Sequence, residues 1–117
     1  MRVLITGAAG FIGHQLLEEL AIQHPEWTLI AADIRPLDGR GLKANIEPVL
    51  LDMGRPAQVR ACISGWQPDA IVHLATVIRP PRDMSEAHLH AIEVGGTQCL
   101  VDSAVANGVR QLIVTSS

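Results

Sequence analysis

VLITGAAGFIG, residues 3–13, is the stretch that decides the fold of this 117-residue chain. The apolar, β-branched run from Arg2 to Thr6 predicts a buried strand that ends at Gly7. Beyond the glycines the apolar residues recur at helical spacing, and Pro25 ends the predicted helix at about His24. A strand that enters a glycine-rich turn and leaves it as a helix is the geometry of a dinucleotide-binding site.

Each of the three glycines in this stretch has a separate physical reason. Gly7 lets the chain turn sharply away from the strand, Gly10 lets the backbone approach a pyrophosphate, and Gly13 lets the helix lie close to the sheet. The free N–H groups of the first helical turn and the positive end of the helix dipole then face the phosphates. We therefore assign Phe11 and Ile12, together with the three glycines, to a predicted cofactor site.

An acidic residue, Asp33, follows the next apolar run, Thr28–Ala32, about 20 residues after Gly13. Its carboxylate can accept hydrogen bonds from the adenosine ribose and would repel a 2′-phosphate, which favours NAD as the cofactor. Arg35 could accommodate a 2′-phosphate, so NADP stays open. Ile34, between these two residues, is included in the predicted site.

Strand-like and helix-like segments alternate along the rest of the chain. Residues 35–46 carry the turn residues of a loop. The alternation predicts an α/β fold with a parallel sheet and right-handed crossovers. The further strands are expected at Pro48–Leu51, Ala70–Ala75 and Gln111–Thr115, and the further helices at Pro56–Gly65 and Asp83–Asn107, with Gly108 as the C-cap.

Gly95 and Gly96 stand inside the last predicted helix, where each costs about 1 kcal/mol relative to alanine. Close approach of this helix to a neighbouring backbone would explain that cost. His73 lies near the end of the fourth predicted strand. We interpret it as a packed, hydrogen-bonded histidine rather than a base.

Composition excludes several classes of function. The net charge is −3 with no basic run, so neither nucleic acid nor an acidic membrane surface is an expected partner. No apolar stretch approaches the roughly 18 residues that a membrane span needs. Cys62 and Cys99 have neither disulfide nor metal-site spacing. We expect reduced thiols, a cytoplasmic protein and no bound metal.

Five segments in order resemble the extended short-chain dehydrogenase/reductases of the NAD-dependent epimerase/dehydratase family. They are TGAAGFIG from Thr6, LDM from Leu51, VHLAT from Val72, EVGGTQCL from Glu93 and IVTSS from Ile113. The resemblance implies a Rossmann-type doubly wound sheet with five strands in the order 3-2-1-4-5, incomplete because a further strand is expected beside the fifth. It also implies that residues 1–117 are the N-terminal part of an NAD(P)-binding domain and that the substrate-binding portion is absent from this chain.

The same resemblance implies roles for residues outside the glycine turn. Asp52 would meet the adenine amino group and Met53 would lie on the adenine ring. Ser117 corresponds to the catalytic hydroxyl that hydrogen-bonds the substrate oxygen. Glu93 departs from the family, which has asparagine there, and a carboxylate donates no hydrogen bond unless it is protonated. The remaining cofactor-site residues that the resemblance implies are Leu74, Ala75, Thr76, Thr115 and Ser116.

The family also uses a tyrosine and a lysine for proton transfer, and this chain has no tyrosine and only Lys43, in a predicted loop. The chain alone therefore lacks groups needed for activity. The resemblance implies the NAD-binding portion of an epimerase, dehydratase or dehydrogenase that acts by hydride transfer on a sugar or nucleotide sugar, as a homodimer when full length. Two alternatives stay open: a non-catalytic NAD(P)-sensing regulatory protein and an NADP-dependent carbonyl reductase.

Overall fold

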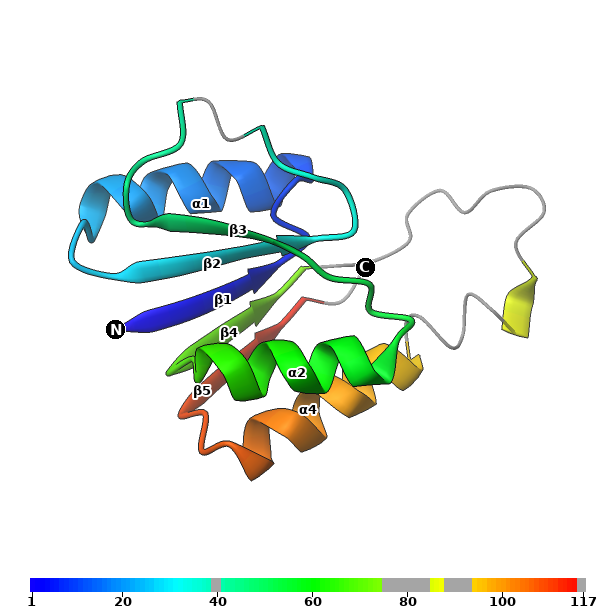
Figure 1. Cartoon of the computed structure of the whole chain (residues 1–117). Coiled ribbons are helices and arrows are strands. Elements are labelled where there is room, and N and C mark those ends of the chain that lie inside the picture. The colour runs from blue at the N-terminus through cyan, green and yellow to red at the C-terminus, as the bar shows by residue number, and fades with distance from the viewer. Residues whose placement is uncertain (39–40, 75–84, 88–93, 116–117) are drawn as a thin grey trace.

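The computed structural model of the chain describes residues 1–38, 41–74, 85–87 and 94–115. Its centre is a parallel five-stranded sheet with the order β3-β2-β1-β4-β5, which confirms the predicted Rossmann-type α/β fold and strand order. The crossovers bring the carboxyl ends of all strands to one edge of the sheet (Figure 1). The strands are β1 (Arg2–Thr6), β2 (Thr28–Asp33), β3 (Ile46–Leu50), β4 (Ala70–His73) and β5 (Gln111–Val114).

Helices cover both faces of the sheet. Helix α1 (Phe11–Gln23) lies on one face, and α2 (Pro56–Trp66) and α4 (Gly96–Ala106) lie side by side on the other (Figure 1). Alternate residues of β1 point to opposite faces, so Ile5 packs in the cluster under α1 and Leu4 in the cluster under α2 and α4. Strands buried on both faces explain the continuous apolar runs in the sequence.

The third strand begins earlier than the sequence pattern predicts. It starts at Ile46 rather than Pro48, because Ile46 pairs with Leu29 of β2 and is almost fully buried. Proline has no backbone N–H, and Pro48 is tolerated because β3 is an edge strand, which forms hydrogen bonds to a neighbouring strand on one side only. The loop predicted over residues 35–46 is correspondingly one residue shorter at its end.

The last helix ends as predicted. Gly108 has a φ of 71°, a left-handed conformation that favours glycine. Its N–H donates to the Val105 carbonyl, and the Val109 N–H donates to the Ala104 carbonyl. This pair of hydrogen bonds is the Schellman arrangement that satisfies the final carbonyls of a helix. Of the helix predicted over Asp83–Asn107, residues 83–84 and 88–93 lie outside the described residues.

The predicted close approach to a neighbouring backbone is confirmed for Gly96, the first residue of α4, and wrong for Gly95, its N-cap. A Cβ on Gly96 would lie 2.6 Å from the Met53 carbonyl oxygen, whereas a Cβ on Gly95 would meet nothing within 4 Å in the described part of the chain. We expect Gly96→Ala to lower the free energy of unfolding by about 1–3 kcal/mol, because backbone would have to move. Gly95→Ala is the matched control, expected to change it by less than about 1 kcal/mol. Urea unfolding measures both, and equal effects would contradict the contact.

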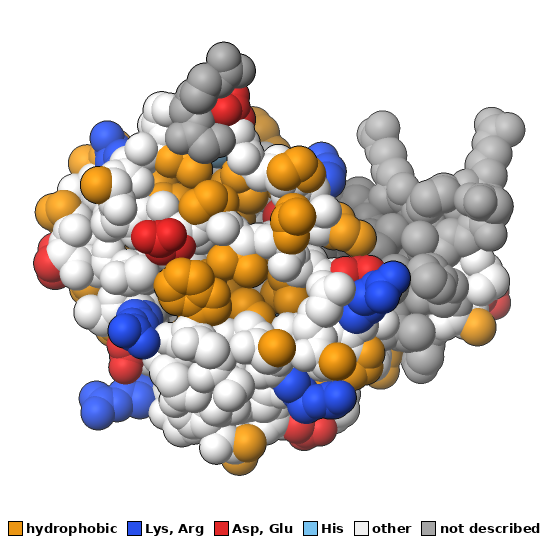
Figure 2. All heavy atoms as spheres, viewed as in Figure 1, with side chains coloured by type: hydrophobic (Ala, Val, Ile, Leu, Met, Phe, Trp, Pro, Cys, Tyr) orange, Lys and Arg blue, Asp and Glu red, His pale blue; other side chains and the backbone are white. Residues whose placement is uncertain are grey.

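Several large apolar side chains remain at the surface. Ile12, in the first turn of α1, is 69% exposed, whereas Leu17 and Ala21 of the same helix are buried. Figure 2 shows hydrophobic side chains at the surface between α1 and α2, along the side where β3 forms the edge. Within the described ranges, none of the helices combines the length and apolar character that crossing a membrane requires.

Candidate functional site

The glycine turn between β1 and α1 has a backbone that side chains would disturb. Gly7 has a φ of 73°, and its carbonyl oxygen accepts the Gly10 N–H at 3.1 Å. A Cβ on Gly13 would lie only 2.1 Å from that same oxygen. The predicted close approach at Gly13 is therefore real, but it is to the backbone of the turn itself. The turn can fold this tightly because Gly7 adopts a left-handed φ and because Gly13 has no Cβ to clash with the Gly7 oxygen.

Gly10 differs from the other two glycines. Its φ of −75° suits any L-residue, and a Cβ there would lie 3.3 Å from the Gly7 oxygen, a tight but adjustable contact. Folding alone therefore demands glycine less strongly at this position. A need for bare backbone near a ligand, as the sequence predicts, is a separate reason for a glycine here.

The first turn of α1 offers backbone donors to an anion. Gly10 is the N-cap and has no side chain that could accept their hydrogen bonds, and no acidic residue lies in this turn. The first N–H groups of a helix lack intrahelical partners, and the positive end of the dipole lies there. Phe11 and Ile12, the first two helical residues, are 79% and 69% exposed. This end of α1 therefore has the donor set that a diphosphate needs.

Asp33 holds the turn to the end of β2. Its Oδ2 accepts the Ala9 N–H at 2.9 Å, and its Oδ1 accepts the Arg35 N–H at 2.9 Å. The Arg35 Nε lies 3.6 Å from Oδ1, although the Arg35 side chain is largely exposed. A carboxylate has about four acceptor positions, so Asp33 retains capacity for ribose hydroxyls. The structure thus brings together the predicted glycine turn and the predicted acid, with Ile34 exposed beside them.

Asp52 and Met53 follow β3 and lie in different environments. Asp52 accepts the Gly54 N–H at 2.9 Å and pairs with Arg55, whose Nε lies 3.4 Å from Oδ2. Met53 is only 6% exposed and packs in the core under α2 and α4. Their roles at adenine stay predictions, in which Met53 would offer the ring only a small exposed area.

His73 occupies the end of β4 inside a hydrogen-bonded network. Its Nδ1 lies 2.7 Å from the Thr6 hydroxyl, and its Nε2 lies 3.2 Å from the Thr97 hydroxyl. The Leu74 N–H donates to the Thr6 hydroxyl at 3.0 Å. His73 is 5% exposed, which confirms a packed, hydrogen-bonded histidine. Burial lowers the pKa of His73 below its ordinary value of 6.5.

The lowered pKa of His73 predicts a loss of stability in acid. The unfolded chain binds a proton near pH 6.5 while the folded chain does not, so stability falls as the pH drops through 6.5 towards the lowered folded pKa. We expect His73→Asn to reduce the slope of unfolding free energy against pH in this range, by up to about 1.4 kcal/mol per pH unit. Urea unfolding between pH 7.5 and 5 measures the slope, and an unchanged slope would contradict the prediction.

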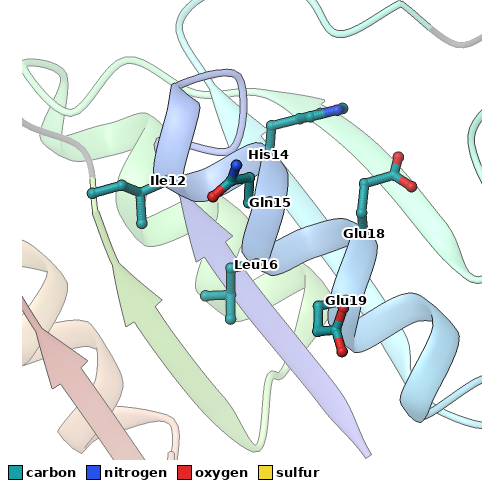
Figure 3. Close-up of a pocket in the computed structure, with 6 residues that line it drawn as sticks. All are labelled: Ile12, His14, Gln15, Leu16, Glu18 and Glu19. Carbon is teal, nitrogen blue, oxygen red and sulfur yellow. The ribbon is translucent and has the colours of Figure 1, made fainter.

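A separate surface pocket lies on α1. Figure 3 shows its lining side chains spreading from one helix in different directions rather than converging on one point. Ligand sites have polar groups that converge, so we assign no function to this pocket. The pocket is lined by Ile12, His14, Gln15, Leu16, Glu18 and Glu19.

Among the described residues, no group of three His, Cys, Asp or Glu side chains could hold a metal ion.

Part of the predicted site lies outside the described residues: Ala75, Thr76, Ser116 and Ser117, and also Glu93. Thr115 is described, and its N–H and hydroxyl both donate to the His73 carbonyl at 3.3 Å. Leu74 lies directly after β4 and is half-buried. The described ends of β4 and β5 therefore lie side by side, and Leu74 is hydrogen-bonded to Thr6, the residue before the glycine turn.

Three residues that hydrogen-bond to Asp33 or His73 were not predicted from the sequence: Ala9, Thr6 and Thr97. Ala9 acts through its backbone N–H, which no sequence pattern reveals. Thr6 and Thr97 belong to the quoted segments TGAAGFIG and EVGGTQCL. The hydroxyl in each segment could have suggested a hydrogen bond, but the sequence does not show that His73 is the partner of both.

Comparison with known proteins defines the family. Residues 3–117 match the model of the NAD dependent epimerase/dehydratase family, so the chain belongs to that family, as its five segments indicate. NAD is the family's cofactor, in agreement with the cofactor predicted from Asp33. The chain is 32% identical to a dTDP-L-rhamnose 4-epimerase from Burkholderia thailandensis, over 99% of this chain and 34% of that protein.

Solved structures show the same fold. Uronate dehydrogenase from Agrobacterium tumefaciens superposes with a TM-score of 0.77 at 32% identity, over 99% of this chain and 40% of that one. The enzyme WbmG from Bordetella bronchiseptica, in complex with NAD, superposes with a TM-score of 0.82 at 25% identity, over 97% of this chain and 36% of that one. The chain thus spans about a third of the length of the relatives it matches.

Proposed function

We propose that this chain is the NAD-binding portion of an enzyme that oxidises or epimerises a sugar or nucleotide sugar by hydride transfer. The observation that carries the proposal is the Asp33 carboxylate, hydrogen-bonded to the glycine turn at the open end of α1. A ribose acceptor and a set of diphosphate donors are thereby held side by side. The similar epimerase and uronate dehydrogenase support a sugar as the substrate class.

Each group of residues in the site has a task in this proposal. The N–H groups of the first turn of α1 bind the diphosphate, and Asp33 binds the adenosine ribose. Bound NAD supplies the position that accepts and returns a hydride. Ser117 hydrogen-bonds the substrate oxygen, and in the sequence it follows β5 and Thr115, which end at the carboxyl edge of the sheet, where ligands bind in such folds. Proton transfer would need a tyrosine and a lysine; the chain has no tyrosine, and its one lysine, Lys43, lies in the loop before β3.

Two wider features belong to the same proposal. We place the protein in the cytoplasm, which the free thiols of Cys62 and Cys99 support. Burial raises the pKa of the Cys62 thiol, which keeps it protonated and unreactive. We also propose a homodimer for the full-length protein.

Gly10→Ala tests the cofactor site without disrupting the turn. Since a methyl group at Gly10 needs only a small adjustment, we expect unfolding free energy to change by less than about 1.5 kcal/mol. The same methyl stands where a phosphate would approach, so NAD affinity should fall at least about tenfold. Calorimetry on the full-length protein measures the affinity.

Gly95→Ala is the matched control, because Gly95 is the N-cap of α4 and its Cβ would meet nothing within 4 Å among the described residues. It should leave NAD affinity unchanged. Full-length protein that is folded and gives no heat with NAD would refute the proposed function.

A further inference from the structure

The proposed function leaves unused a buried side chain at the carboxyl edge that lies within hydrogen-bond distance of two hydroxyls. His73 is buried at the end of β4, where its two ring nitrogens contact the hydroxyls of Thr6 and Thr97. Its carbonyl oxygen accepts both the N–H and the hydroxyl of Thr115. One residue therefore joins β1, the start of α4 and the end of β5, three segments that come from distant parts of the chain (Figure 1).

Each segment joined by His73 carries part of the proposed site. Thr6 directly precedes Gly7 and the glycine turn, and Thr115 precedes Ser116 and Ser117. Thr97 follows Gly96, the residue whose backbone packs against Met53. The network therefore connects the diphosphate end, the adenine side and the strand that leads to the proposed catalytic hydroxyl.

A packed apolar residue would fill the same space without the cost of burying an imidazole. A buried histidine, by contrast, holds its neighbours in place, because a neutral imidazole has one donor and one acceptor that need partners at set positions. Both partners are hydroxyls, which can donate or accept, and both are present within hydrogen-bond distance. The Leu74 N–H also donates to the Thr6 hydroxyl, so the end of β4 is held by the same network.

We propose that His73 is a positioning residue of the proposed NAD site, which holds the glycine turn, the start of α4 and the end of β5 in the arrangement that binds the cofactor. The inference rests on the proposed function. His73 itself touches no cofactor in this proposal. It acts through Thr6 on the turn and through Thr97 on α4.

The test compares the shape and the hydroxyl of Thr97 in the full-length protein. Thr97→Val keeps the branched shape and removes the hydroxyl, and Thr97→Ser keeps the hydroxyl. We expect Thr97→Val to raise the dissociation constant for NAD about fivefold to tenfold and Thr97→Ser to stay within twofold of wild type. Ser103→Ala, which removes another buried hydroxyl of α4, is the control expected to leave NAD affinity unchanged.

A double variant shows whether the effect passes through the imidazole. His73→Asn places an amide near the Nδ1 position, so it retains a partner for Thr6 and loses the contact to Thr97. Alone it should weaken NAD binding as much as Thr97→Val does, and combining the two should add no further loss. Calorimetry is done at a temperature where circular dichroism shows every variant folded.

Three outcomes overturn the inference: Thr97→Val within twofold of wild type, Thr97→Ser as weak as Thr97→Val, or losses that multiply in the double variant. The first two would mean that Thr97 contributes to NAD binding through packing alone or not at all, and the third that His73 and Thr97 act independently. Wild-type protein that binds no NAD would overturn the proposed function instead. The two failures are therefore distinguishable.

Discussion

Replacing Gly13 by alanine is expected to destabilise the protein by more than about 3 kcal/mol or to prevent it from folding. The added Cβ would lie 2.1 Å from the Gly7 carbonyl oxygen and 3.0 Å from the Ala8 Cα. Both neighbours are backbone atoms, so no side-chain rotation relieves the clash. Helix α1 would have to move away from the turn, and the apolar cluster beneath Leu17 and Ala21 would open.

Gly65→Ala is the matched control for this prediction. Gly65 is also a helical glycine, in α2, and a Cβ there would meet nothing within 4 Å among the described residues. Alanine has a higher helix propensity than glycine, so the free energy of unfolding of this variant should rise by up to about 1 kcal/mol. Urea unfolding of both variants measures the difference. A Gly13→Ala protein with wild-type stability would mean that the turn and α1 are further apart than the structure has them.

The fold was predictable from periodicity because the strands are buried on both faces. Continuous apolar runs and helical spacing identify such elements locally, as in Arg2–Thr6. The strand order came from family resemblance, since parallel strands pair across long connections that local pattern does not encode. The start of β3 was missed for the same reason: Ile46 is fixed by pairing with Leu29, not by its neighbours in sequence.

The sequence could predict the candidate site only where the site depends on glycines, which lack a side chain, or on a charged residue. Glycines and a strand-end acid are visible in the sequence, so Gly7, Gly13 and Asp33 could be named from it, and the structure brings them together. The partner of Asp33 was not, because Ala9 contributes a backbone N–H that every residue but proline has. Nor was the network of His73, whose partner Thr6 lies 67 residues away in the chain.

Replacing Asp33 by asparagine is expected to lower NAD affinity about 30-fold or more. Both carboxylate oxygens accept a backbone N–H, from Ala9 and from Arg35, at 2.9 Å each. An asparagine has one carbonyl oxygen, so its NH₂ group would face one of these donors, at a cost of about 1–3 kcal/mol. The charged acceptor for the ribose is lost at the same time, and hydrogen bonds to a charged group are worth about 1.5–3 kcal/mol.

Cofactor preference separates this role from general damage to the site. The carboxylate repels a 2′-phosphate, and Arg35, whose guanidinium now lies by Asp33, would be released to meet it. Asp33→Asn should therefore reduce the ratio of NAD to NADP affinity at least about tenfold, since NADP loses less than NAD does. Asp69→Asn is the matched control, because Asp69 also accepts a backbone N–H, from Arg2 at 2.8 Å, but lies at the amino edge of the sheet. It should cost stability and leave the ratio unchanged. Calorimetric titration with both dinucleotides decides the matter, and an equal fall in both affinities would mean that Asp33 shapes the turn without reading the ribose.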